Sequence, residues 1–544
     1  MPQALRRLPA DVGVLLLTAL ALLLTLFLTQ SQYLARWDSA QFALALDRVD
    51  VRAHQPHPPG YPWYVAVARW LRPIALGEAN RAYLLVNWLL TFGGAWAVAL
   101  LGHRWGGWRL GLAAAAVFLA SPQTRYNTDV VLSYPAAACF FAWIGYAAWK
   151  VWAEGDRRWW WPFLLAGVGG AFRIPTLVLA IPVLLAVWWR LSAVRKVLAV
   201  LLVGGILAAA YVPIIQVSGG WEAYRAAAAS EAVKHETRFS RFGRSPIAEL
   251  FSNWRAMVDY LYLAFGLGAI MPLGLLALRS KRTPEPWLEP AEDPAVPWGR
   301  FLLWWALPAF VLYTLIHVNS PGVFLDLQAP LALLVTMGVA AINTRGAFVF
   351  VALALVLHLV ARFATADGPK DQGLPLIRAV DHLMAVHTQD LPAAAPSAST
   401  LLMVGESFKQ DGYYLPGYRV VWDKYLLRAS GPVETPILTM KGHLLEPWVL
   451  EGSRVNGVTI RFLPFPEGTT ALACDPAALS SLYPEQVPWA QPVSERGKQS
   501  LVLIPVEGKS GIVMSPEMGW WIVQDAHERK AAEDALAALA QMRR

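Results

Sequence analysis

Residues 12–28 read VGVLLLTALALLLTLFL, an apolar run that begins shortly after the basic residues Arg6 and Arg7. A helix needs about 20 mostly apolar residues to cross the hydrocarbon core of a bilayer, and this run approaches that length. A cleaved signal peptide is the alternative, but the run is long for one and the small-residue cleavage pattern after it is poor. We therefore interpret residues 11–30 as a retained first transmembrane span.

Similar apolar runs continue as far as residue 363. Of the 544 residues, 56% are hydrophobic and only 15% are charged, whereas soluble domains carry about 25% charged residues. Tryptophans gather at the ends of the runs, which is typical of the bilayer interface. The further spans are expected near residues 83–102, 109–121, 130–149, 197–217, 256–278, 299–317, 325–343 and 346–363.

Residues 159–189 are too long for one ordinary span, and Arg173, Ile174 and Pro175 interrupt them. A charge at the bilayer centre costs about 2.5–3.5 kcal/mol on insertion scales, and a proline removes a helical hydrogen bond. Two short helices that meet at Arg173 on the outer face avoid both problems and give about eleven transmembrane helices. The short inner loops are then all basic, as orientation in a membrane requires. These loops are His103–Arg109, Lys150–Arg158, Arg190–Lys196, Arg279–Arg300 and Asn343–Arg345.

The net charge of +8 does not indicate nucleic-acid binding, because the basic residues occupy short clusters between apolar runs. The two cysteines are Cys139, in an apolar run, and Cys474, near the other end of the chain. They predict no disulfide framework, and thiol chemistry or a cysteine zinc site is poorly supported. The sequence thus divides into a polytopic α-helical membrane domain, 1–363, and a soluble C-terminal domain, 364–544.

The C-terminal domain is expected to be a small α/β domain on the outer face. Pro and Gly punctuate its short strand-like runs. A helix is expected over residues 526–542, which are alanine-rich and amphipathic. The expected strands are Leu401–Val404, Arg419–Trp422, Val458–Phe462, Ala471–Ala473 and Leu501–Val506.

The first outer loop, 31–82, contains most of the informative residues. Its segment WDSAQFALAL, Trp37–Leu46, places Asp38 directly after the first span. Asp38 is a candidate base, but with Gln41 it also resembles the capping box of an amphipathic surface helix that begins near Ser39. The Pro-rich segment HQPHPPGYP then carries His54 and His57. These histidines could bind phosphate or a metal, although the spacing matches no standard zinc motif and a structural turn is the alternative.

This arrangement of one span, an outer aspartate, a surface helix and a His-Pro-Pro-Gly-Tyr-Pro segment resembles the GT-C superfamily of membrane glycosyltransferases. The likeness is to the protein mannosyltransferase and aminoarabinose transferase types, over residues 10–345. It implies a polyprenyl-phosphate sugar donor, and it implies that Asp38 is the base. Many members have Asp-Glu where this chain has Asp38-Ser39, so a second carboxylate and any metal that it would hold are not implied. No cofactor is indicated, and a divalent cation stays open.

The resemblance also points to residues farther along the chain. Asp129 matches an acidic residue at the outer end of the fourth span, with a helix cap as the alternative. Arg173 matches a basic residue at the outer helix break, and an ionisable residue within a membrane indicates function by default. His317 matches a late outer-loop motif that could touch the lipid phosphate, although a lone interfacial histidine is often structural. In the second long outer loop, 218–255, the basic cluster is a candidate phosphate site or a solvated surface; it comprises Lys234, His235, Arg238, Arg241 and Arg244.

The expected activity is that of an inverting hexosyl- or pentosyltransferase of the plasma (inner) membrane, with its active site on the extracytoplasmic side. Its partners would be the polyprenyl-phosphate sugar donor, membrane lipids and a glycan, lipid or protein acceptor, and no nucleic acid. Asp38 would accept the proton of the acceptor hydroxyl, while Arg173 and neighbouring cations neutralise the departing phosphate. A transporter or flippase is the first alternative, although it predicts repeated halves and polar residues at mid-membrane, and neither is seen. A non-catalytic relative whose tail binds a partner is the second.

Overall fold

The computed structural model divides the chain into two compact units. The helical unit comprises residues 1–32 and 48–377, and the sheet unit comprises residues 33–47 and 378–544. The residues that the structure describes are 20, 22–24, 30–238, 251, 253–259, 296–315, 321–342, 397–404, 408–422, 433–435, 448–455, 458–474, 491–492, 502–515 and 519–542.

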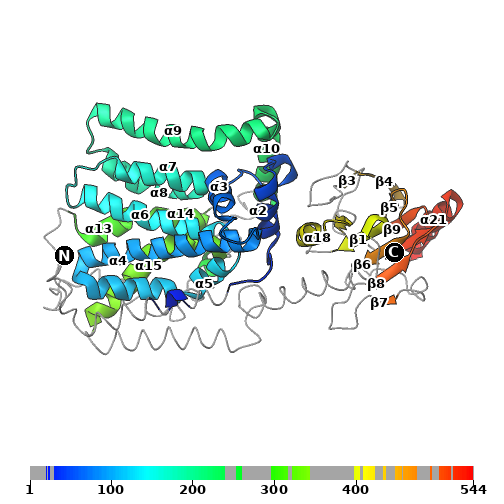
Figure 1. Cartoon of the computed structure of the whole chain (residues 1–544), viewed down its shortest axis with the longest axis horizontal. Helices are drawn as coiled ribbons and strands as arrows, with labels where there is room; N and C mark the ends of the chain where they lie inside the picture. Colours follow the sequence, from blue (N-terminus) through cyan, green and yellow to red (C-terminus); the bar gives the residue numbers. More distant parts are fainter. Residues whose placement is uncertain are drawn as a thin grey trace. The chain divides into compact units, whose positions relative to one another are not determined.

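The long helices of the helical unit run roughly parallel to one another (Figure 1). They are α4 (Ala79–Ala120), α6 (Tyr134–Trp152), α7 (Trp161–Phe172), α8 (Ile174–Trp188) and α9 (Ala193–Val217). Helix α6 is central, since it packs against α4, α7, α8 and the later helix α15. The shorter described elements are η1 (Val51–Ala53), α3 (Pro62–Leu71), α5 (Pro122–Asp129), α10 (Trp221–Arg238), α13 (Trp298–Trp305), α14 (Leu307–Leu315), η2 (Pro321–Phe324) and α15 (Leu325–Ile342).

The predicted break at Arg173 is confirmed. Helix α7 ends at Phe172, α8 begins at Ile174, and Arg173 between them is extended, with φ −159° and ψ 107°. Pro175 lies in the first turn of α8, where its missing N–H has no helical partner to lose. Charge and proline together therefore end one helix and begin the next.

Helix α4 covers two of the expected spans and is interrupted between them. Gly106 and Gly107 have non-helical backbone angles, and Gly107 has a positive φ of 81° that favours glycine. The chain folds back here, because a Cβ on Gly102 would lie 2.8 Å from Cα of Gly111. Among the described residues, α4 and α9 are long and apolar enough to cross a membrane by length and composition. The number of spans stays a prediction.

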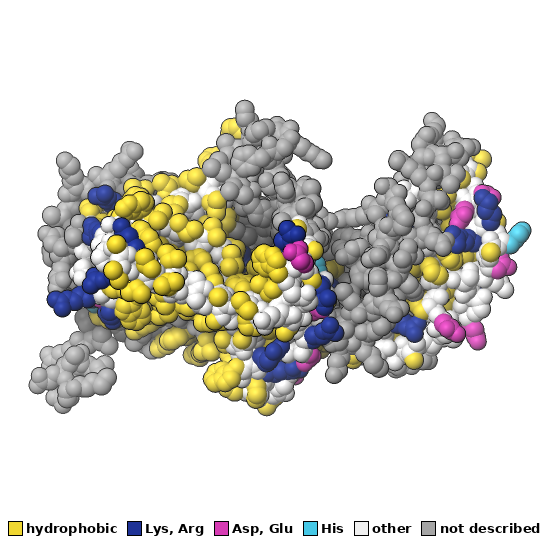
Figure 2. Space-filling model, turned by 90° about the horizontal axis from the view of Figure 1, so that it is seen from above, with side chains coloured by type: hydrophobic (Ala, Val, Ile, Leu, Met, Phe, Trp, Pro, Cys, Tyr) yellow, Lys and Arg dark blue, Asp and Glu magenta, His cyan; other side chains and the backbone are white. Residues whose placement is uncertain are grey.

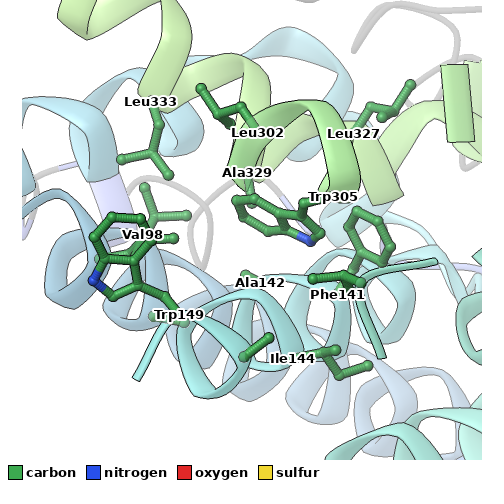
Figure 3. Packing of buried hydrophobic residues seen from close by; sticks show 14 of the residues in the cluster. Val98, Phe141, Ala142, Ile144, Trp149, Leu302, Trp305, Leu327, Ala329 and Leu333 are labelled. Atoms are coloured by element: carbon green, nitrogen blue, oxygen red, sulfur yellow. The ribbon is translucent and has the colours of Figure 1, made fainter. Parts of the chain in front are cut away.

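The core of the helical unit is packed through small residues and aromatic rings (Figure 3). Trp305, from α13, is stacked on Phe141 of α6 with 5.6 Å between ring centroids. A side chain on Gly145 would overlap the Trp305 ring. Close packing at small residues is how helices associate where lipid is as apolar as the side chains. Figure 3 also shows Ala329 and Leu333, both from α15, in this cluster.

The outer surface of the helical unit is broadly hydrophobic, with Lys and Arg gathered towards its two ends (Figure 2). Helix α9 contributes exposed Val194, Val197, Val200 and Leu201. So large an exposed apolar surface is unusual for a soluble monomer. An apolar band with basic ends is the arrangement that suits a lipid bilayer.

The sheet unit contains two five-stranded sheets with orders β2-β1-β6-β8-β7 and β10-β9-β5-β4-β3. In the first, β1 pairs in parallel with both β2 and β6. In the second, each neighbouring pair of described strands is antiparallel. The expected strands and the C-terminal helix α21 (Ala526–Met542) are confirmed. The bounds are β1 (Thr400–Val404), β2 (Arg419–Trp422), β3 (Val433–Thr435), β4 (Trp448–Val455), β5 (Val458–Pro464), β6 (Ala471–Cys474), β7 (Gln491–Pro492), β8 (Val502–Pro505), β9 (Gly511–Ser515) and β10 (Gly519–Val523).

The expected helix of the first outer loop is present as α2 (Trp37–Asp47), and it belongs to the sheet unit. Its expected amphipathic, surface character is wrong, because every residue from Ser39 to Leu46 is buried. The helix begins at Trp37, so Asp38 lies within the first turn and not at the preceding capping position. A carboxylate in the first turn is favourable beside the positive end of the helix dipole.

Candidate functional site

A buried polar centre lies in the helical unit around Arg173, at the break between α7 and α8. Arg173 is buried, with 8% of its surface exposed. Its Nη1 donates a hydrogen bond to Oγ of Ser133 over 3.3 Å. Its guanidinium carbon lies 4.4 Å from the centroid of the Tyr134 ring, a cation–π distance. The start of α6 thus holds the guanidinium by one hydroxyl and one aromatic face.

The acid of this centre is Asp326, in the first turn of α15, and it is completely buried. Tyr313 donates its hydroxyl to Oδ2 over 2.8 Å, and Thr176 donates to Oδ1 over 3.5 Å. Asp326 also interacts electrostatically with Arg173. A buried carboxylate is costly without such partners, so the two charges compensate each other.

Asp326 was missed in the sequence, although the signal for it was present. Asp326 is the second residue of the expected span 325–343, and an intramembrane carboxylate indicates function by default. Its partner on α14 could not be found in this way, because the phenol of Tyr313 is an ordinary residue of an apolar run.

The guanidinium of Arg173 keeps unused hydrogen-bonding capacity. Its Nε is buried and has no hydrogen-bond partner among the described residues. A guanidinium carries five N–H donors in a planar fork that matches phosphate or carboxylate oxygens. The guanidinium therefore has a donor beyond the one that bonds Ser133, and its chemistry suits an oxyanion.

The Pro-rich segment contributes two further side chains near this centre, those of His57 and Tyr61. Nε2 of His57 lies 2.9 Å from the hydroxyl oxygen of Tyr61, and Tyr61 interacts electrostatically with Arg173. The segment is fixed from α10, since Tyr224 donates its hydroxyl to the carbonyl oxygen of Pro59 over 2.9 Å. The structure thus links two predicted residues, His57 and Arg173, through a tyrosine that the sequence analysis did not single out.

His54 occupies a turn. It follows η1 in the left-handed region with φ 55°, and its N–H donates to the carbonyl oxygen of Val51 over 3.2 Å. In the same loop, the Asp50 carboxylate accepts from Nη2 of Arg52 over 2.8 Å and from Nη2 of Arg48 over 3.3 Å. Burial raises the pKa of Asp50, but the hydrogen bonds and charges of these arginines outweigh it, so that the pKa lies below its usual value.

Gly322 fixes the Tyr134 ring from the side of η2. A Cβ on Gly322 would lie 2.5 Å from Cε2 of Tyr134 and 2.8 Å from Oδ1 of Asn127. Contacts this short are not tolerated in folded proteins, so glycine is required for this approach. Gly322 ends the predicted late motif, whose His317 lies outside the described residues.

Asp129 is the fully buried last residue of α5. The helix-cap alternative is wrong for α6, whose N-cap residue is Ser133. Arg125, one turn earlier on α5, is also buried and interacts electrostatically with Asp129. The backbone carbonyl of Asp129 further accepts from N–H of Ser31 over 2.9 Å. These contacts suit a residue that fixes α5.

The other candidates lie in different parts of the chain. Asp38 is half-buried in the sheet unit, and Lys234, His235 and Arg238 lie in the C-terminal half of α10. Within the described ranges, no group of three or more His, Cys, Asp or Glu is placed to hold a metal ion.

Comparison with known proteins gives matches at the level of structure. No family model matches the sequence, and no curated protein matches it. ArnT from Cupriavidus metallidurans in the apo state matches with a TM-score of 0.55 at 12% identity, over 91% of this chain and 98% of that one. The same protein bound to undecaprenyl phosphate matches with a TM-score of 0.53 at 14% identity, over 90% of this chain and 98% of that one. The chain therefore has the fold of ArnT, and the membrane-helical fold with a C-terminal domain that the predicted resemblance implies is confirmed.

Proposed function

We propose that this chain is an inverting glycosyltransferase that moves a sugar from a polyprenyl-phosphate donor to an acceptor hydroxyl. The observation that carries the proposal is the buried Arg173 guanidinium, whose Nε has no partner among the described residues. The fold supports it, because a solved structure of ArnT is described as bound to undecaprenyl phosphate. The sugar would be a hexose or pentose, and the reaction would occur on the outer face of the plasma membrane.

In this reaction the acceptor oxygen forms a bond to the anomeric carbon while the bond from that carbon to the phosphate oxygen breaks. The electron pair of the broken bond leaves with the polyprenyl phosphate. Arg173 would stabilise the charge that develops there. Asp38 would accept the proton of the acceptor hydroxyl, which is the role of a general base. One displacement inverts the anomeric carbon.

The contacts of Asp326 give it a supporting role in this chemistry. It balances the charge of Arg173 before donor binds and, with Tyr313, it fixes the start of α15. His57 and Tyr61 would add hydrogen bonds to the phosphate or the sugar. His54, Lys234, His235, Arg238 and His317 stay candidate donor contacts. Asp129 stays a candidate acid, although its pairing with Arg125 favours a structural role.

Donor binding by Arg173 is tested with the full chain in lipid nanodiscs. Arg173→Ala should lower affinity for undecaprenyl phosphate at least tenfold, because a charge-assisted bidentate contact is lost. Arg158→Ala is the matched control, since Arg158 also lies over an aromatic ring, 4.3 Å from the centroid of Trp161. It sits at the other end of α7 and is exposed. Unchanged affinity in Arg173→Ala would overturn the assignment of the phosphate site.

Catalysis is tested separately by transfer from defined polyprenyl-phosphate sugars. Accumulation of glycosylated acceptor with inverted anomeric configuration is the expected result. A flippase would move the donor between leaflets without consuming it, and a non-catalytic relative would bind it without turnover. Either outcome, with donor bound, would refute the transferase proposal.

A further inference from the structure

The beginning of helix α2 is held by the C-terminal part of the same unit. The backbone N–H of Leu34 donates to the hydroxyl of Tyr414 over 2.8 Å, across 380 residues of sequence. The ring of Tyr33 meets that of Tyr414 edge-on, with centroids 5.5 Å apart and planes at 75°. Two neighbouring residues before α2 therefore contact one side chain, which is the last residue of helix α18 (Phe408–Tyr414).

A second contact lies at the first residue of α2. Trp37 packs against a buried cluster of the sheet unit. The cluster consists of Leu402, Val404, Leu415, Tyr418, Val420 and Ala473. Because Trp37 directly precedes Asp38, this packing anchors the turn that carries the candidate base.

Tyr414 is itself placed by a rigid element. Helix α18 connects the parallel neighbours β1 and β2, whose register aligns Leu401 with Arg419. After the helix, the N–H of Leu415 donates to the carbonyl oxygen of Asp411 over 2.8 Å. A side chain at the end of such a β–α–β unit has little freedom, so Tyr414 can define the position of the segment before α2.

We propose that the C-terminal domain positions Asp38, with Tyr414 as a positioning residue that acts through α2. This role rests on the proposed function, in which Asp38 is the base. Leu34 is completely buried, and without the phenol its N–H would lose an acceptor that buried donors require. The segment before α2 would then shift to recover a partner. Displacement of a catalytic group by about 1 Å can cost about 100-fold in rate.

The test compares Tyr414→Phe with wild type in the full chain, reconstituted in nanodiscs with a polyprenyl-phosphate sugar. The turnover number should fall about 10- to 100-fold, while donor affinity stays within about twofold of wild type, because the phosphate contacts are untouched. Thr469→Val is the control. It removes another hydrogen bond of the sheet unit, from Oγ1 of Thr469 to the carbonyl oxygen of Pro466, and should leave the turnover number unchanged.

A double variant separates positioning from a general loss of packing. If Tyr414 acts through Asp38, Tyr414→Phe should have no further effect in an Asp38→Asn background, because residues that act as a unit are non-additive. This role alone would be overturned if the rate losses of the two single variants multiplied in the double variant. It would also be overturned if Tyr414→Phe kept the wild-type rate while Asp38→Asn lost its turnover. A wild-type rate in Asp38→Asn would overturn the proposed base and this role together. If Tyr414→Phe fails to fold, Tyr33→Leu takes its place. It removes the edge-on ring contact with Tyr414, and its turnover number is compared with wild type and in the Asp38→Asn background.

Discussion

Arg173 and Tyr134 form a cation–π pair, with the guanidinium carbon 4.4 Å from the ring centroid. Gly322 lies so close to that ring that a Cβ at this position would clash with it. The pair joins the α7–α8 break to the start of α6 and to η2. Its geometry is therefore set by three parts of the chain that are remote in sequence.

Gly322→Ala should weaken donor binding by disturbing Arg173 indirectly. The added Cβ would lie 2.5 Å from Cε2 of Tyr134, so the ring must move and the guanidinium loses its support. We expect undecaprenyl phosphate affinity to fall about tenfold, since overpacking costs about 1–3 kcal/mol. Gly205→Ala is the matched control, because a Cβ there, in α9, meets nothing within 4 Å. Equal affinities in the two variants would contradict the coupling.

Asp326→Asn should destabilise the protein, and donor should compensate for part of the loss. The substitution leaves Arg173 buried without its counter-charge, which typically costs about 3–5 kcal/mol. An anionic phosphate supplies the missing charge. The rise in Tm on addition of undecaprenyl phosphate should therefore be larger in Asp326→Asn than in wild type. A smaller or equal rise would show that Asp326 does not balance Arg173.

Asp38→Asn should remove turnover and spare binding. Asparagine keeps the size of the side chain but cannot accept the acceptor's proton, and a general base contributes about 10²–10⁴-fold in rate. Donor affinity and Tm should stay as in wild type. Asp47→Asn changes an exposed acid at the other end of α2 and should be silent in all three measurements. An unchanged rate in Asp38→Asn would move the search to Asp129.

The Asp50 ion pairs should make the first loop sensitive to acid. The pKa of Asp50 is lowered in the folded protein, so its stabilisation is present above the unfolded value of about 3.9. It is lost as the pH falls through the lower folded pKa. We expect Asp50→Asn to lower Tm at pH 6, and the difference from wild type to shrink as the pH falls below about 4. A constant difference from pH 6 to pH 3 would show that the charge is unimportant.

Local signals predicted much of the fold. The run Arg419–Trp422 follows a turn that contains Pro416 and Gly417 and forms β2. Arg173 followed by Pro175 ends one helix and begins another. The burial of α2 could not be predicted, because its partner Tyr414 is 380 residues away from Leu34. In the same way, a phosphate role for Arg173 could be proposed from its isolation in an apolar run. Its contacts with Ser133 and Tyr134 required the tertiary structure.

The bond from Leu34 to Tyr414 also sets an order of events during biosynthesis. The two residues are 380 positions apart, and ribosomes add about 5–20 residues per second. Helix α2 therefore emerges roughly 20 to 80 s before the residues that hold it exist. During that interval the segment before α2 lacks this contact. A chain cut short before Phe408 would keep this helix without the Tyr414 hydroxyl that holds the segment before it.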